Sequence, residues 1–259
     1  MNRLIGYAGL IFLVIGSMAE AATVMVTGAN RGIGLEFARQ YADKGWMVFA
    51  THRRTNIPES LASLKAQYPD LVRIETLDVK DHTGIDALAK NLEGVPIDLI
   101  VHNAGISGGG SAIQQFGKLD YSTFQGVMDI NVAGPLKISE AFLDHVAASE
   151  SKMIFTVTSS QGSIGSVNRP GLFYYRASKS AVNMVMRNLA QHPKVTENAI
   201  LIGLVAPGAT DTDFMAEVRG RMPLGDPKER VAGMIRQIEN YPRDGSTPSF
   251  EWDGEEIPW

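Results

Sequence analysis

The segment from Thr27 to Gly34, which reads TGANRGIG, limits the fold more than any other part of this chain. It follows an apolar, β-branched run from Thr23 to Val26 and precedes an amphipathic helical pattern. This order of strand, glycine turn and helix is typical of a dinucleotide-binding unit, where backbone N–H groups and the positive end of the helix meet a pyrophosphate. Because Gly28, Gly32 and Gly34 are spaced GxxxGxG and not GxGxxG, the turn also fits a purely structural role.

Strand-like and helical segments alternate along the rest of the chain. The pattern predicts strands at 23–26, 47–51, 72–77, 97–102, 153–158 and 199–205, and helices at 35–44, 58–68, 84–92, 122–131, 135–148 and 174–191. This alternation is typical of a parallel sheet covered by helices on both faces. With 259 residues, 44% of them apolar, the chain fits one large α/β domain beginning near Ala22. The charged tail from Arg219 is expected to wrap the surface and to end with a short strand at 249–252.

Composition excludes several classes of function. The net charge of −4 gives no sign of a nucleic-acid partner. The absence of cysteine removes disulfides, thiolate zinc sites and cysteine nucleophiles, and the five histidines lack a metal-binding spacing. We therefore expect no metal site.

The end of the second predicted strand carries His52, Arg53 and Arg54, with no acidic residue. A carboxylate at this place would bind a ribose 2′-hydroxyl, whereas a guanidinium binds a 2′-phosphate through a charge-assisted fork. Arg53, with Arg31 of the glycine turn as a helper, therefore predicts NADP(H) as the cofactor in preference to NAD(H). The alternative is a solvated basic loop.

Tyr175 and Lys179 are four residues apart within a helical pattern, so their side chains share one helix face. A phenol has a pKa near 10, and a nearby ammonium favours its ionised form. The pair can therefore act in acid–base chemistry. It can equally be an ordinary exposed helix face, so its meaning depends on the other motifs.

Six segments follow one another in the order of a known family: TGANRGIG at 27–34, NAG at 103–105, the asparagine of DINVAGP at 131, SSQGS at 159–163, YxxxK at 175–179 and PGATDTD at 207–213. Together they resemble the short-chain dehydrogenase/reductase family over the whole chain after its first 21 residues. The closing DGEEIPW and the GSI at 162–164 resemble the branch of sniffer-type carbonyl reductases and bacterial C-factor relatives.

The resemblance implies a single Rossmann-type, doubly wound parallel sheet of about seven strands and a catalytic tetrad of Asn131, Ser159, Tyr175 and Lys179. Tyr175 would exchange a proton with the substrate oxygen, and Lys179 would lower the pKa of Tyr175 and hold the nicotinamide ribose. Ser159 would bind the substrate oxygen, and Asn131 would hold a water that links Lys179 to solvent. Spacing to Gly162 and to Tyr175 favours Ser159, with Ser160 as the alternative.

The resemblance also assigns residues to the cofactor. Apart from Arg53, Tyr175 and Lys179, the expected contacts are Gly28, Asn30, Arg31, Gly32, Ile33 and Gly34 at the pyrophosphate turn, Asp78 and Val79 at the adenine, Asn103, Ala104 and Gly105 at the adenosine ribose, and Pro207, Gly208 and Thr212 at the nicotinamide.

The function that these motifs favour is NADPH-dependent reduction of a small aldehyde or ketone. A rival is a non-catalytic NADP(H)-binding sensor or signalling protein of the C-factor type, and a third reading is oxidation with NAD. The family usually forms homodimers through the two long helices beside the fifth strand, so a homodimer is expected.

The N-terminus has the three parts of a secretory signal peptide: Arg3, an apolar run from Leu4 to Gly16, and the small residues of SMAEAA. The run is shorter than the roughly 20 residues of a membrane span. We therefore expect residues 1–21 to be removed on export, which leaves a domain at 22–259 with no stable membrane span. The alternative is a cytoplasmic protein that starts at Met18.

Mass spectrometry of the N-terminus of protein from its native host tests this expectation. The chain should begin between Ala21 and Thr23, because SMAEAA is the small-residue site that follows the apolar run. A cytoplasmic chain that begins at Met18 would show that no export signal is used.

Overall fold

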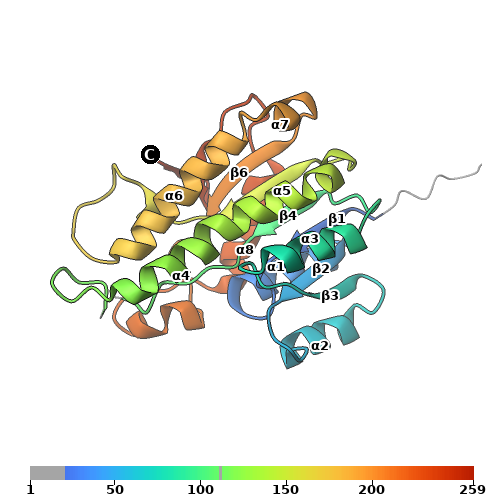
Figure 1. Cartoon of the computed structure of the whole chain (residues 1–259). Coiled ribbons are helices and arrows are strands. Elements are labelled where there is room, and N and C mark those ends of the chain that lie inside the picture. The colour runs from blue at the N-terminus through green and yellow to red at the C-terminus, as the bar shows by residue number, and fades with distance from the viewer. Residues whose placement is uncertain (1–20, 111–112) are drawn as a thin grey trace, which may run out of the picture.

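The computed structural model describes residues 21–110 and 113–259, and it consists of one sheet with helices on both sides (Figure 1). The strand order is β3-β2-β1-β4-β5-β6-β7-β8. The strands are β1 (Thr23–Val26), β2 (Met47–His52), β3 (Val72–Thr76), β4 (Leu99–His102), β5 (Met153–Val157), β6 (Leu201–Ala206), β7 (Ser249–Glu251) and β8 (Glu256–Ile257). β1 to β7 pair in parallel, and β8 returns antiparallel to β7. The doubly wound parallel sheet is confirmed, with β8 as one strand more than the expected seven.

Helices cover both faces of this sheet. The α-helices are α1 (Gly32–Asp43), α2 (Glu59–Gln67), α3 (His82–Asn91), α4 (Phe124–Met128), α5 (Gly134–Ala147), α6 (Phe173–Leu189), α7 (Pro193–Glu197) and α8 (Pro227–Glu239). Short 3₁₀ segments occur at Tyr121–Thr123, Ser160–Gly162 and Asp213–Val218. Apolar residues of α1, α2 and α8 pack on one face of the sheet, and those of α3, α5 and α6 pack on the other.

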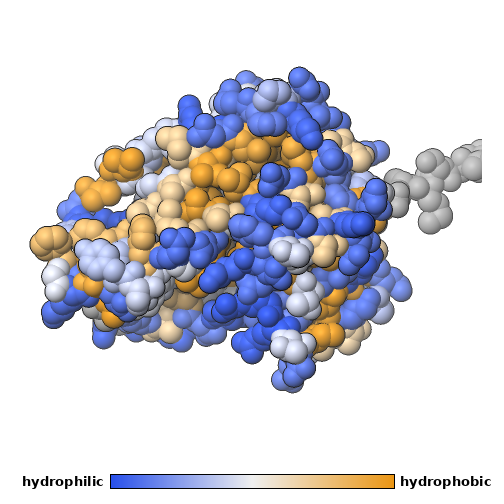
Figure 2. Space-filling model, in the orientation of Figure 1, coloured by the Kyte–Doolittle hydropathy of each residue, from blue (hydrophilic) through white to orange (hydrophobic). Residues whose placement is uncertain are grey.

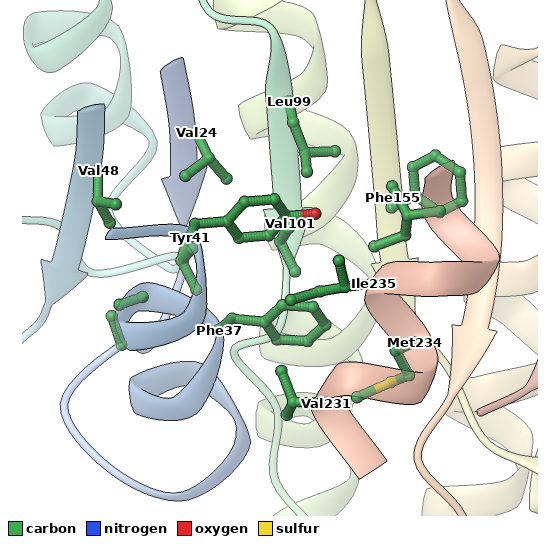
Figure 3. Close-up of a cluster of buried hydrophobic side chains, with 14 of the residues drawn as sticks. Val24, Phe37, Tyr41, Val48, Leu99, Val101, Phe155, Val231, Met234 and Ile235 are labelled. Atoms are coloured by element: carbon green, nitrogen blue, oxygen red, sulfur yellow. The ribbon is translucent and has the colours of Figure 1, made fainter. Parts of the chain in front are cut away.

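Side-chain alternation along the strands divides the core in two. In β1, Val24 and Val26 belong to the cluster under α1 and α8, whereas Met25 belongs to the cluster under α3, α5 and α6. All three are fully buried, as expected of a strand covered on both faces. Figure 3 shows the first cluster, where Phe37 and Tyr41 of α1 meet the side chains of α8 above the central strands.

The prediction that the tail from Arg219 wraps the surface is wrong for its central part. Residues 227–239 form α8, which buries Val231, Met234, Ile235 and Ile238 against the sheet. These four residues have helical spacing on one face, and the charged residues of the segment lie on the other. The high charge hid an amphipathic helix, while the short strand expected at 249–252 is present as β7.

The two helices predicted at 122–131 and 135–148 are one continuous helical stretch. A π-helical segment at Asp129–Ala133 joins α4 to α5, whose first turn contains Pro135. A wider turn of this kind accommodates an interruption without ending the helix, and such turns are frequent at functional sites.

The predicted signal peptide lies outside the described residues, except for Ala21. Within residues 21–110 and 113–259, no helix is long and apolar enough to cross a membrane.

A glycine in the sheet makes room for the packing of an aromatic residue. A Cβ at Gly203 of β6 would collide with the ring of Phe155 on β5, and that ring is fully buried edge-on against Tyr241. We predict that Gly203→Ala destabilises the domain by about 1–3 kcal/mol, because overpacking forces buried groups to move. The measurement is the urea midpoint of unfolding.

Gly126→Ala is the matched control, since a Cβ at this helical glycine meets open space. It should be neutral or slightly stabilising. An equal loss of stability in both variants would contradict the packing explanation.

Candidate active site

The glycine turn lies between β1 and α1 at the carboxyl edge of the sheet, where ligands bind in open α/β folds. Gly28 and Gly32 have positive φ angles of 66° and 53°, which favour glycine. A Cβ at Gly34 would collide with the side chain of Asn103 and with the carbonyl of Gly28. Because no side chain caps α1 and its first turn holds no acidic residue, its end can receive an anion.

The end of β4 holds this turn in place. Asn103 Nδ2 donates to the carbonyl oxygen of Thr27 at 2.9 Å and to that of Gly28 at 3.3 Å. In return, the backbone N–H groups of Asn103 and Ala104 donate to Thr27 Oγ1 at 2.9 and 3.0 Å. The predicted pyrophosphate turn and the predicted ribose contacts therefore form one hydrogen-bonded unit.

His102, directly before this unit, fastens β4 to α5. Ser139 Oγ donates to the carbonyl of Pro135, so it accepts from His102 Nε2, which lies 2.8 Å away. Burial lowers the pKa of His102 to about 3, so the imidazole is neutral at physiological pH. Its role is positional, because the ring lies within the core.

Three of the four predicted catalytic residues meet where β5 ends beside α6. The Ser159 hydroxyl is hydrogen-bonded to the Tyr175 hydroxyl. Lys179 is nearly buried, its Nζ donates to the carbonyl of Val157 at 2.8 Å, and it lies 5.8 Å from the centre of the Tyr175 ring. The sequence thus brings a phenol, an ammonium and a hydroxyl to one place.

Burial dominates the electrostatics of this cluster. It raises the pKa of Tyr175 to about 12, opposed by the hydrogen bond from Ser159. Burial also lowers the pKa of Lys179 to about 8, so the amine still carries its proton at neutral pH. We expected Lys179 to lower the pKa of Tyr175, but in this structure the pKa is raised, and desolvation of the phenol is the largest cause.

The two adjacent serines face different partners. Ser159 faces Tyr175, whereas the Ser160 hydroxyl contacts the carboxyl group of Glu251 on β7 and lowers its pKa, which burial raises. Ser159 Oγ also accepts from the N–H of Gln161 at 3.2 Å, which caps the 3₁₀ segment. The two hydroxyls therefore have different partners.

Asn131, the fourth predicted catalytic residue, lies in the π-helical segment. Its Nδ2 donates to the carbonyl of Ile106 and to Ser178 Oγ, each at 2.9 Å, and its Oδ1 accepts from the N–H of Ile106 at 2.9 Å. A Cβ at Gly105 would lie 3.4 Å from Asn131 Oδ1 and 3.9 Å from Lys179 Nζ. Asn131 therefore borders the lysine and ties the loop after β4 to α6.

The remaining predicted cofactor residues lie at different distances from this centre. Thr212 lies beside the glycine turn, since a Cβ at Gly32 would be 3.3 Å from its methyl group. Arg31 forms an exposed ion pair with Asp213 at 3.4 Å. Ile33 lies in the first turn of α1. The others follow the ends of strands at the same edge: Asn30, Arg53, Asp78, Val79, Pro207 and Gly208.

Sequence reasoning missed two residues at this site. The ring of Phe214 lies 5.6 Å from that of Tyr175 and is partly exposed. Gln114 is fully buried and contacts the first turn of α6. Both come from segments without regular spacing, so no sequence signal identified them.

Comparison with known proteins places this geometry in a family. A family model described as short chain dehydrogenase matches residues 22–222. The 1-hydroxy-2-glutathionyl-2-methyl-3-butene dehydrogenase of Rhodococcus sp. (strain AD45) is 30% identical over 240 residues, which cover 92% of this chain and 100% of that protein. The C-signal protein of Myxococcus xanthus is 31% identical over 173 residues, covering 67% of this chain and 99% of that protein.

A solved structure agrees with these relatives. The NADPH-bound carbonyl reductase from chicken fatty liver superposes with a TM-score of 0.80 at 27% identity, covering 92% of this chain and 99% of that one. With the glycine turn, the tyrosine, lysine and serine at one sheet edge and a family model that spans most of the domain, this chain belongs to the short-chain dehydrogenase family.

Proposed function

We propose that the protein is an NADPH-dependent reductase of a small aldehyde or ketone. The observation that carries the proposal is the surroundings of Tyr175, whose hydroxyl is hydrogen-bonded to Ser159 and whose ring centre lies 5.8 Å from Lys179 Nζ. A phenol whose pKa burial raises to about 12 holds its proton at neutral pH and can donate it. This protonation state favours reduction over the NAD-dependent oxidation considered above.

The residues at the sheet edge fit a nicotinamide dinucleotide phosphate. The uncapped start of α1 offers N–H groups to a pyrophosphate. The close contacts at Gly34 leave no room for a side chain at that position of the turn. Arg53 is exposed at the end of β2, and it forms no ion pair within the described part of the chain. Its guanidinium can therefore bind a 2′-phosphate.

Each catalytic side chain has a separate task in the proposed reaction. A bound nicotinamide supplies the hydride for the carbonyl carbon. Ser159 orients the carbonyl oxygen, and Tyr175 transfers its hydroxyl proton to that oxygen. The Lys179 ammonium stabilises the phenolate that remains, and Asn131 holds a water that links Lys179 to solvent. Phe214 gives the substrate an apolar neighbour at the Tyr175 ring.

A binding protein without catalysis is the second candidate, and the likeness to the C-signal protein of M. xanthus supports it. Such a protein needs the glycine turn and can use Lys179 to hold the ribose, but it has no need of Tyr175 and Lys179 together. We therefore place the reductase first.

The assembly that we propose is a homodimer through α5 and α6. These helices form one face of the molecule, over which Figure 2 shows hydrophobic residues gathered. Leu136 of α5 and Met184 of α6 expose 42% and 61% of their surface. Apolar surface of this kind marks interaction sites. Sedimentation of the purified protein tests the proposal, because it measures whether the particle has the mass of one chain or of two.

Replacing the tyrosine tests the reaction. Tyr175→Phe keeps the ring against Phe214 but removes the proton aimed at the substrate oxygen. We predict that kcat for aldehyde reduction falls by about 10²–10⁴-fold, the usual worth of general acid catalysis. The affinity for NADPH, measured by fluorescence titration, should change little. A variant that reduces the aldehyde as fast as the parent would favour the binding-protein alternative.

Other substitutions in the cluster serve as controls. Lys179→Ala should lower the rate and weaken NADPH binding. Ser159→Ala should approach the rate loss of the tyrosine variant, whereas Ser160→Ala should retain most activity because that hydroxyl contacts Glu251. If Ser160→Ala loses more activity than Ser159→Ala, the substrate contact belongs to Ser160.

Replacing the arginine after β2 tests cofactor choice. Arg53→Asp should weaken NADPH binding by about 1.5–3 kcal/mol, the worth of a hydrogen bond to a charged group, and should spare NADH. Lys90→Asp is the control, because it makes the same charge change at the far end of α3. It should change the affinity for neither NADPH nor NADH. A parent protein that binds NADH as tightly as NADPH would refute this reading of Arg53.

A further inference from the structure

The helix that carries Tyr175 begins without a capping side chain of its own. The residue before its first turn is Leu172, which has a positive φ of 52° and no side-chain oxygen. In most helices, the second and third N–H groups are capped by Ser, Thr, Asp or Asn at that position. In α6 those two groups belong to Tyr174 and Tyr175, so the uncapped turn is the one that holds the proposed proton donor.

Gln114, distant in sequence, supplies the missing cap. Its Oε1 accepts from the N–H of Tyr174 at 2.9 Å and from that of Tyr175 at 3.1 Å. The side chain of Gln114 is fully buried, at 0% exposure, so water does not compete for these bonds. An amide oxygen has two lone pairs, and each of the two N–H groups takes one.

The other end of the same amide binds the loop after β4. Gln114 Nε2 donates to the carbonyl of Ser107 at 2.5 Å, with longer contacts to those of Gly110 at 3.3 Å and Gly108 at 3.4 Å. Since N–H groups surround one end and carbonyls the other, only one orientation of the amide satisfies both sides. At physiological pH, glutamine is the uncharged residue of this length that both accepts at one end and donates at the other.

The loop that Gln114 binds is close to the reaction centre. Ile106, directly before Ser107, exchanges two hydrogen bonds with Asn131, and the Gly108 backbone packs closely against Val127 of α4. Gln114 and Asn131 therefore hold one short loop from two sides, and each also reaches α6, at Tyr174 and Tyr175 or at Ser178.

We propose that Gln114 is a positioning residue for the reaction, which caps the first turn of α6 and ties it to the loop at 106–110 so that the Tyr175 hydroxyl is held against Ser159. The proposal rests on the proposed role of Tyr175 as proton donor. Within the described part of the chain, Gln114 forms no hydrogen bond with the glycine turn or with Arg53, the residue that would bind the 2′-phosphate.

Amide hydrogen exchange tests the cap without reference to activity. Gln114→Met keeps the approximate volume but removes both ends of the bridge, and should speed exchange of the Tyr174 and Tyr175 amides by roughly tenfold or more, as expected for lost hydrogen bonds. Gln114→Glu keeps an acceptor at the helix end, where negative charge is favoured, but loses the donor. In this variant the amides of the first turn of α6 should stay protected from exchange, while those of the loop at 106–110 should exchange faster. Gln115→Met, at the exposed neighbouring position, should match the parent.

Kinetics with NADPH and an aldehyde test positioning. In Gln114→Met, kcat should fall by about 10–100-fold, because a misplaced catalytic group is costly, whereas the dissociation constant for NADPH should stay within about threefold. Gln114→Glu should recover part of the lost kcat.

Two outcomes would overturn the proposal. One is an unchanged kcat and unchanged α6 exchange in Gln114→Met. The other is faster exchange spread evenly over β1, β4 and β5, with no excess at α6, since that pattern marks loss of general stability. If the parent reduces no carbonyl compound, the proposed function fails, and the exchange measurement alone still decides whether Gln114 caps α6.

Discussion

Burial of both faces of the parallel sheet is the constraint on which the rest of this structure depends. The central strands are almost wholly apolar, and α1 and α8 cover one face while α3, α5 and α6 cover the other. A polar group within such a sheet loses its hydration and needs a buried partner, as His102 of β4 has in Ser139. Chemistry is therefore confined to the carboxyl edge, where every strand of β1 to β6 ends beside its neighbours.

Confinement to an edge creates a second requirement, because loops that leave the sheet expose backbone groups that need partners. Single side chains meet this need by joining two segments. Asn103 and Thr27 connect the ends of β4 and β1, and Asn131 connects the loop after β4 to α6. Gln114 likewise connects the loop after β4, at Ser107, to the first turn of α6, at Tyr174. The geometry of the edge is thus determined by a few buried amides and hydroxyls.

The same burial sets the electrostatic character of the centre. Removing Tyr175 and Lys179 from water disfavours the charged form of each, which raises the pKa of the phenol and lowers that of the amine. At neutral pH the phenol keeps its proton, and the amine keeps its charge. This combination suits donation of a proton by Tyr175 and stabilisation of the resulting phenolate by Lys179, which is the direction that our proposed reduction requires.

By itself, the sequence determined the alternating α/β order, the glycine turn at Gly28 to Gly34, and the meeting of Ser159, Tyr175 and Lys179, because these depend on local periodicity and on strand ends that share an edge. Composition misled at 227–239, where high charge concealed the amphipathic α8. Spacing favoured Ser159 over Ser160, but only the tertiary structure showed that Ser159 faces Tyr175 and Ser160 faces Glu251, since the directions of adjacent side chains depend on backbone rotations. It alone revealed Gln114, because a cap supplied from about 60 residues away leaves no local pattern, and its hydrogen bonds exist only when the loop and α6 are packed together.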